Sequence, residues 1–323
     1  MLRISFGALN RQSALVKGAE EIVTRTHVAA VKTLMAQEGI APSGVDVIGL
    51  HGQTIYHAPR DGVTIQIGDG AAMAKELGID VVDDFRSKDV KAGGEGAPLA
   101  PVYHAARMAS EQAVFPCAVL NIGGVANVTW IGEGDGNILA FDTGTGNALM
   151  DDWMKTRTGA AYDKDGQAAQ KGMVQTKFLK EWLSHPYFTQ TPPKSLDRNE
   201  WDIADMGGFT HMIESMSTED GAATLQAFTV EGIVRSVAFM PTPPKVWYAC
   251  GGGRHNKALM AALNARLGGI VKPVDDLGWN GDATEAECFA YLAVRSVMGL
   301  PLSFPTTTGV KTPQTGGVVH RHL

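Results

Sequence analysis

The stretch CAVLNIGGVANVTWIGEGDGNILAFDTGTGN, residues 117–147, carries the clearest structural pattern of the chain. Three runs rich in apolar and β-branched residues, 117–122, 125–131 and 137–141, are separated by a Gly-Gly pair and by GEGDG. Short glycine turns between such runs are typical of an antiparallel meander. A helix is expected to follow, from residue 147 to about residue 156. Three hairpin-linked strands, then a helix and further strand–helix pairs, indicate a ribonuclease-H-like α/β unit.

Further elements on both sides of this meander follow from apolar periodicity and from capping residues. Asp69 is expected to cap a short helix that ends at Gly78. The glycine-rich residues 85–99 predict a loop, and the tail from Ser303 predicts an extended strap. The region 157–220 is expected to be rich in loops, with several helical patches and a PPKS turn. The other strands are expected over 45–50, 63–68, 79–82 and 245–250, and the other helices over 12–38, 100–108, 222–239, after Gly253 and over 283–298.

Length and composition limit the class of protein. The chain of 323 residues is long enough for two domains, and its net charge of −6 offers no basic surface for nucleic acid. The sequence predicts no signal peptide and no membrane span. The widely spaced Cys117, Cys250 and Cys288 are typical of a reduced, cytoplasmic protein rather than of a disulfide or zinc framework. No P-loop, Rossmann, α/β-hydrolase or zincin motif is present.

The segment FDTGTGN, residues 141–147, predicts a site for phosphate chemistry. Asp142 ends an apolar strand, and a Gly-Thr-Gly turn after it opens a helix. A glycine-rich approach to a helix N-terminus suits a phosphate group. A carboxylate beside it can bind a metal or take a proton from an attacking oxygen, so we favour a catalytic Asp142. The alternative is that Asp142 only caps the helix.

Two other glycine turns fit a nucleotide. Gly123 and Gly124 in NIGGVANVT could turn backbone N–H groups toward an anion, although a plain hairpin turn explains them as well. The three glycines of CGGGRHN, residues 250–256, follow a buried strand. Close passage of a flat base and ribose explains them better than a tight turn, and a loose helix start is the alternative.

Hydrogen-bonding groups suited to a sugar lie nearer the beginning of the chain. The segment LHGQTIYHAP, residues 50–59, places His51, Gln53 and Thr54 just beyond a strand, and His51 is expected to be structural. Arg86 and Lys88 belong to a glycine loop that could hold a carboxylate or phosphate, or could be a solvated surface.

Nine motifs together resemble those of the anhydro-N-acetylmuramic acid kinases, over about residues 45–318. They are HGQTIYHAP, TIQIGDG, DFRSKDVKAGGEGAPL, LNIGGVANV, FDTGTGN, YDKDG, PPKS, CGGGRHN and SFPTTTG, in that order. The resemblance implies two actin-like ATPase domains of ribonuclease-H-like fold, 1–116 and 117–323, with a cleft between them. It also implies an ATP-dependent reaction of peptidoglycan recycling, in which water opens 1,6-anhydro-N-acetylmuramic acid and O6 takes the γ-phosphoryl group, and it suggests a homodimer.

The resemblance also implies roles for individual residues. Asp142 matches the aspartate that activates water. Mg²⁺ and loop amides are expected to neutralise the phosphates, and no metal ligand is assigned. The residues implied on the nucleotide side are Gly123, Gly124, Gly144, Gly146, Asn147, Gly251, Gly252, Gly253 and Asn256. The residues expected on the sugar side are Gln53, Thr54, Lys88 and Glu285, of which Glu285 could instead be a first-turn acid favoured by the helix dipole.

Three departures from the family pattern stand out. Lys88 replaces an arginine of some relatives and loses the planar fork, and Thr145 replaces the proline of FDTGPGN. Nothing before residue 45 matches the family's first phosphate loop, MSGTSxDGxD, which we expect to reflect a start placed too far downstream or a real truncation. The alternative functions are a kinase of an ordinary amino sugar and a non-catalytic remnant that binds sugar or nucleotide.

Overall fold

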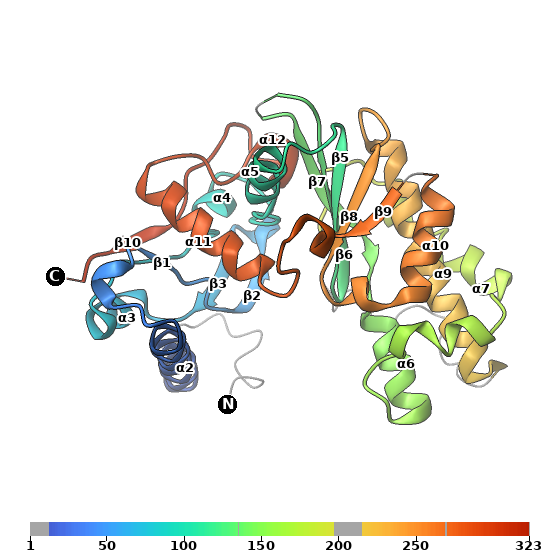
Figure 1. The fold of residues 1–323 in the computed structure, drawn as a ribbon, viewed down its shortest axis with the longest axis horizontal. Coiled ribbons are helices and arrows are strands. Elements are labelled where there is room, and N and C mark those ends of the chain that lie inside the picture. Colours follow the sequence, from blue (N-terminus) through green and yellow to red (C-terminus); the bar gives the residue numbers. More distant parts are fainter. Residues whose placement is uncertain (1–12, 135, 197–214, 269, 323) are drawn as a thin grey trace. The chain divides into compact units, whose positions relative to one another are not determined.

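The computed structural model describes residues 13–134, 136–196, 215–268 and 270–322. The chain divides into two compact units (Figure 1): Met1–Tyr103 with Glu285–Leu323, and His104–Thr284. The predicted domains, 1–116 and 117–323, instead place the end of the chain with the meander. These domain boundaries stay a prediction, because a compact unit and a folding domain need not coincide.

The first unit contains a three-stranded sheet and a hairpin. The sheet has the order β1-β4-β10, in which β1 is parallel and β10 antiparallel to β4. The strands predicted at 45–50, 63–68 and 79–82 are present with shorter or shifted bounds. The hairpin strand β2 was not predicted, because its polar residues QTIYHA do not form an apolar run. The strands are β1 (Ile48–Gly49), β4 (Val81–Asp83), β10 (Val318–His320), β2 (Gln53–Ala58) and β3 (Val63–Ile67).

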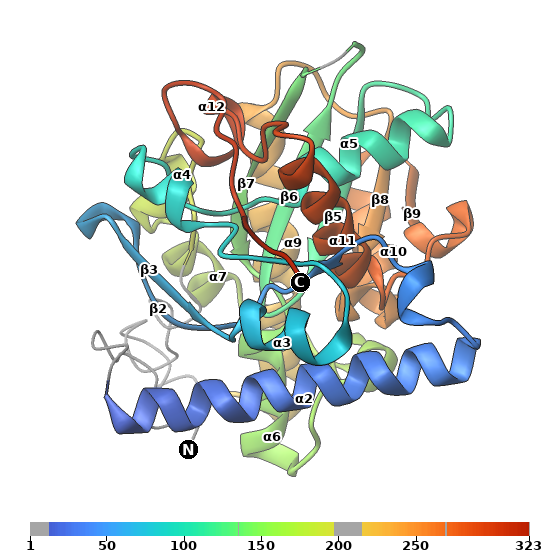
Figure 2. The same cartoon turned by 90° about the vertical axis from the view of Figure 1, so that its left-hand side faces the viewer.

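Two predicted helices of this unit begin at a capping side chain, of which Asp69 was expected and Ser13 was not. The Ser13 side chain accepts the N–H of Val16 at the start of α2 (Ala14–Glu38), which packs along α3 (Figure 2). Asp69 accepts the N–H of Ala72 at the start of α3 (Gly70–Leu77), and Gly78 follows it. The remaining helices are α4 (Ser87–Lys91), α5 (Pro101–Ser110), which continues into the second unit, α11 (Thr284–Val297) and α12 (Pro305–Thr308). Helix α4 lies inside the predicted loop 85–99, so that prediction was wrong there.

Asp89 of α4 joins the glycine loop to the C-terminal part of the chain. Its side chain is 2% exposed, and its Oδ1 accepts the N–H of Gly96 at 2.7 Å. Its Oδ2 accepts the hydroxyls of Ser303 and Thr308. A buried carboxylate with three donors is well satisfied, and this explains how two of the quoted motifs pack together.

The second unit contains the predicted meander inside a five-stranded sheet. Its order is β7-β6-β5-β8-β9, with β7, β6 and β5 antiparallel and β8 and β9 added in parallel. The meander is confirmed, but β7 continues beyond Phe141 to Thr145. Asp142 therefore does not end the strand as predicted, and Gly144 and Thr145 pair with β6. Strand β9 was not predicted. The strands are β5 (Cys117–Ile122), β6 (Val125–Ile131), β7 (Ile138–Thr145), β8 (Val246–Cys250) and β9 (Ile270–Pro273).

Apolar side chains of α9 and α10 pack on this sheet. Val230 and Ile233 of α9, with Leu259 and Leu263 of α10, share one buried cluster with sheet residues such as Leu120. The helices of this unit are α6 (Ala148–Thr158), α7 (Thr176–Trp182), α9 (Thr218–Ser236) and α10 (Lys257–Leu267). The described part of the region 157–220 consists mainly of short turns, and its residues 197–214 lie outside the described residues.

No helix in the part of the chain that the structure describes is long and apolar enough to cross a bilayer.

Candidate active site

The three predicted glycine turns of the second unit meet where β5 and β8 end. The side-chain Nδ2 of Asn147 donates to the carbonyl of Ile122 at 3.1 Å, which joins the start of α6 to the end of β5. A Cβ at Gly253 would lie 2.4 Å from Ile122 and 3.2 Å from Asn147. The structure therefore brings together turns that are more than a hundred residues apart in the chain.

The amides at the start of α6 are bonded within the protein. The N–H of Gly146 donates to the carbonyl of Gly124 at 2.9 Å, and that of Asn147 donates to the carbonyl of Gly123 at 2.7 Å. A Cβ at Gly146 would lie 2.2 Å from the same Gly123 oxygen, so only glycine fits there. These bonds hold the two turns together, and the phosphate-facing role of Gly123, Gly124, Gly144, Gly146 and Asn147 stays a prediction.

Close packing explains two of the three glycines of CGGGRHN. Gly251 has a φ of 74°, and a Cβ there would lie 2.4 Å from Oδ1 of Asn121. Gly253 is buried against Ile122, whereas Gly252 is exposed and has open space beside its Cα. The base-and-ribose interpretation is therefore needed only for Gly252.

Arg254 and Asn256 hold the glycine turn in place. The Arg254 side chain is almost fully buried, pairs with Asp275 and Asp282 at 2.8 Å each, and donates to the carbonyl of Gly251. Asn256, predicted to bind nucleotide, accepts the N–H of Leu259 at 3.0 Å and so caps α10. Its Oδ1 therefore has a structural partner.

Asp142 lies within β7, two residues before Gly144. A β-bulge interrupts the pairing of β6 with β7 between Ala126 and Asn127, the partner of Asp142. Bulges re-aim side chains and are frequent beside active sites. The Asp142 Oδ2 accepts the N–H of Leu196 at 2.7 Å, so the carboxylate does not cap α6. The alternative reading of Asp142 as a helix cap is thus wrong.

The environment of Asp142 suits a proton acceptor. Burial raises the pKa of Asp142 to about 7, although the Leu196 N–H and the charge of Lys194 both lower it. Burial also lowers the pKa of Lys194 to about 8, against the effect of Asp142. A carboxyl group whose pKa lies near neutrality can both take up and release a proton at working pH. Lys194 and Leu196 were missed as site residues, although PPKS signalled this segment.

The residues predicted for the sugar side lie in the first unit. Gln53 and Thr54 are on β2, and the Thr54 hydroxyl accepts the side-chain amide of Gln66 at 3.2 Å. The exposed Lys88 donates to the hydroxyl of Thr315. Glu285 is exposed in the first turn of α11, as the first-turn alternative also expects. The roles of Gln53, Thr54, Lys88 and Glu285 in sugar binding stay predictions.

Arg86 and His51 form a half-buried pair in the same unit. The Arg86 guanidinium donates to Nε2 of His51 at 3.0 Å and to the carbonyl of Gly96 at 2.7 Å. Burial and the charge of Arg86 lower the pKa of His51 to about 3, so the imidazole is neutral at pH 7. The ring of Phe289 lies 4.5 Å from that of His51. These contacts agree with the structural role expected of His51, which stays a prediction.

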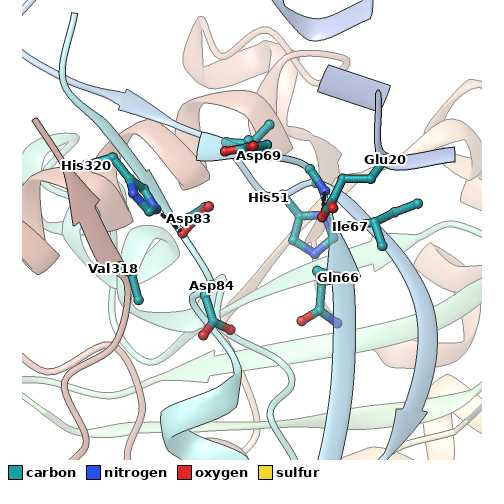
Figure 3. Close-up of a pocket in the computed structure, with 12 residues that line it drawn as sticks. Glu20, His51, Gln66, Ile67, Asp69, Asp83, Asp84, Val318 and His320 are labelled. Atoms are coloured by element: carbon teal, nitrogen blue, oxygen red, sulfur yellow. Dashed lines mark hydrogen bonds and ion pairs between the residues drawn. The ribbon is translucent and has the colours of Figure 1, made fainter. Parts of the chain in front are cut away.

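A cavity of about 310 Å³ lies beside this pair and was not predicted (Figure 3). Glu20 of α2, Asp69, Asp83 and Asp84 line it together with His320. Glu20 accepts the N–H of Gly68, and Asp83 accepts Nε2 of His320 at 2.9 Å. The described residues contain no cluster of three His, Cys, Asp or Glu side chains able to hold a metal ion. The cavity joins residues distant in sequence, so no local pattern signalled it.

Known proteins resemble the chain over nearly its whole length. Curated anhydro-N-acetylmuramic acid kinases include one from Rhizorhabdus wittichii, 51% identical over 99% of this chain and 85% of the relative. The one from Zymomonas mobilis is 49% identical over 96% of this chain and 82% of the relative. A solved xylulose kinase from Lactobacillus acidophilus covers 90% of this chain and 55% of its own at 12% identity, and its TM-score of 0.40 is too low to bear on the fold.

The match to a family model extends the resemblance toward the start of the chain. The model for anhydro-N-acetylmuramic acid kinase matches residues 10–322, whereas the quoted motifs begin only near residue 45. Helix α2 therefore falls within the matched region. The chain belongs to the anhydro-N-acetylmuramic acid kinase family.

Proposed function

We propose that this chain is an ATP-dependent kinase that opens 1,6-anhydro-N-acetylmuramic acid with water and phosphorylates O6. The products are N-acetylmuramic acid 6-phosphate and ADP, and the reaction serves peptidoglycan recycling. Membership of the family supports the reaction. The observation that carries the mechanism is the carboxylate of Asp142, held by the Leu196 N–H beside the glycine turns and with a pKa of about 7.

The chemistry needs one proton acceptor. The oxygen of water forms a bond to C1 while the bond from C1 to the bridging O6 breaks, and O6 forms a bond to the γ-phosphorus as ADP leaves. Asp142 takes the proton that water loses. Since Oδ2 is held by Leu196, Oδ1 is the oxygen that receives this proton. A base whose pKa is near 7 is ionised often enough to act and basic enough to accept the proton.

ATP and Mg²⁺ are the proposed cofactors. Kinase chemistry uses ATP, and Mg²⁺ is bound mainly by phosphates and water with one or two carboxylates. We propose that the turns at Gly123–Gly124, Gly144, Gly146–Asn147 and Gly251–Gly253, with Asn256, face the nucleotide, and that exposed Gly252 contacts it directly.

The fold of the second unit supports an actin-like architecture. An antiparallel meander extended by two parallel strands is the arrangement expected of a ribonuclease-H-like sheet. We therefore propose two actin-like domains, 1–116 and 117–323, with Gln53, Thr54, Lys88 and Glu285 binding the sugar. We also propose a cytoplasmic homodimer that needs neither nucleic acid nor a membrane partner.

The test compares Asp142→Asn with Asp152→Asn, a matched change at an exposed residue of α6. ADP release with 1,6-anhydro-N-acetylmuramic acid and mass spectrometry of product made in ¹⁸O-water are the measurements. We expect the D142N variant to lose product formation by at least about a thousandfold and to keep nucleotide binding, while D152N is unaffected. Normal turnover by D142N would refute the assignment. Product without ¹⁸O at C1 would favour the kinase of an ordinary amino sugar.

A further inference from the structure

Lys194 is a buried lysine that the proposed mechanism does not use. Only 4% of its surface is exposed, and its Nζ donates to the carbonyl of Tyr187 at 2.8 Å. The ammonium lies 4.4 Å from the ring of Tyr187, 4.8 Å from that of Phe239 and 5.9 Å from that of Phe141. Aromatic faces stabilise a desolvated cation, and a buried charge without such compensation is costly. The site is therefore built to keep an ammonium group inside the unit.

The backbone around Lys194 encloses Asp142. The N–H of Asp142 donates to the carbonyl of Lys194 at 3.0 Å, and the N–H of Leu196 donates to Oδ2 of Asp142 at 2.7 Å. The Tyr187 hydroxyl donates to the carbonyl of Asp142 at 2.6 Å. The Lys194 side chain completes this set of contacts, because its Nζ donates to the carbonyl of Tyr187, the residue whose hydroxyl bonds to Asp142. Moving Lys194 would therefore move the amide that orients the carboxylate.

We infer that Lys194 is a positioning residue for Asp142, one that fixes residues 194–196 against β7 and supplies a positive charge that favours the ionised form of the carboxylate. This inference rests on the proposed role of Asp142 as the base. Lys194 itself does not contact the reacting atoms in this scheme, because its ammonium is turned into the aromatic cage and bonded to Tyr187.

The charges around Asp142 favour this role. Two other titratable or charged side chains on neighbouring segments have backbone partners of their own. His185 accepts the N–H of Tyr187, and Arg235 of α9 donates to the carbonyl of Leu183. Within the described residues, Lys194 is the one charged group whose field acts on the pKa of Asp142. It lowers that pKa against the larger effect of burial. Loss of the ammonium should therefore leave Asp142 protonated at higher pH.

The experiment is the pH dependence of kcat for Lys194→Met, Lys194→Arg and Tyr187→Phe. Methionine removes the charge and keeps an apolar stem, arginine keeps the charge, and phenylalanine removes only the hydroxyl bond to the Asp142 carbonyl. The acid limb is the part of the pH profile in which kcat falls as the pH is lowered. For K194M we expect this limb to move up by about one pH unit. At pH values below the limb kcat should then be about tenfold lower than in the parent protein, and it should recover toward pH 9. K194R and Y187F should keep the limb within about 0.3 unit of the parent protein.

The outcomes separate this inference from the proposed function. A folded K194M with an unchanged acid limb overturns the inference, whatever its kcat, because a purely structural lysine could lower activity without moving the limb. Lys194→Gln, which can still donate to Tyr187, serves as a second uncharged variant, and failure of both to fold also overturns it. An active D142N variant would refute the proposed role of Asp142 as the base. If D142N is inactive but the acid limb of K194M lies at the same pH as in the parent protein, only the role of Lys194 is refuted.

Discussion

Single glycines in the turn after β8 differ in what a methyl group would meet. At Gly253 a Cβ would lie 2.4 Å from Ile122, whereas at Gly252 the nearest atom is 3.9 Å away. We expect Gly253→Ala to lower the free energy of unfolding by roughly 1–3 kcal/mol, because overpacking displaces the end of β5. Gly252→Ala is the matched control and should stay within about 0.5 kcal/mol. Urea denaturation of both variants measures the difference, and equal losses would contradict the packing described for this turn.

The sequence predicted residues whose role is local. Asp69 was predicted to cap the helix that follows it, since a cap acts on an amide three residues away. Asp142 was predicted from its place between a strand and a glycine turn. Its partners Tyr187, Lys194 and Leu196 were not predicted as its neighbours, because no local pattern specifies which segment will pack against a strand dozens of residues earlier.

At the scale of elements, Asp89 joins α4 to the segment around α12. Removing it by Asp89→Ala leaves the Gly96 amide and the Ser303 and Thr308 hydroxyls without their buried acceptor. We expect a loss of about 3 kcal/mol in the free energy of unfolding, since each buried donor without a partner is costly. Asp61→Ala, at an exposed carboxylate, is the control and should have little effect.

Thermal denaturation followed by circular dichroism compares these two variants. If D89A has the same melting temperature as D61A, the glycine loop and the C-terminal segment are held together by other contacts.

Some helices and strands could be predicted from the residues within them, whereas others form only because they contact residues far away in the sequence. The meander could be predicted because its strands are joined by short glycine turns. Strand β10 consists of three residues in a segment without periodicity, and it becomes a strand by pairing with β4. Helix α4 is only five residues long, and Asp89 anchors it from inside a polar, glycine-rich stretch. Short elements of this kind depend on tertiary contacts that the local sequence does not encode.

For the whole molecule, three buried groups give stability a defined pH dependence. Burial lowers the pKa of His51 to about 3 and that of His104 to about 4, so both bind protons on unfolding at mildly acid pH. Their contribution is present above the unfolded histidine pKa and is lost as pH falls. Burial raises the pKa of Asp142 to about 7, so this group releases a proton on unfolding, and its contribution is lost as pH rises. The two effects oppose each other between about pH 4.5 and 6.

The Asp142→Asn variant removes the opposing group. We expect its free energy of unfolding to fall more steeply on acidification than that of the parent, by about 1.4 kcal/mol per pH unit between about pH 4.5 and 6. Urea titrations at four pH values measure both slopes. Parallel slopes would mean that Asp142 ionises in the folded protein as it does in water.

The pairing of β10 with β4 also bears on synthesis. His320 bonds to Asp83, 237 residues earlier, so the ribosome makes β10 long after it has made β4. The second unit is one uninterrupted segment, His104–Thr284, and can close its sheet on the nascent chain first. Until β10 has been made, the edge of β4 that pairs with it has no partner strand. The three-stranded sheet of the first unit is therefore completed later than the sheet of the second unit can be.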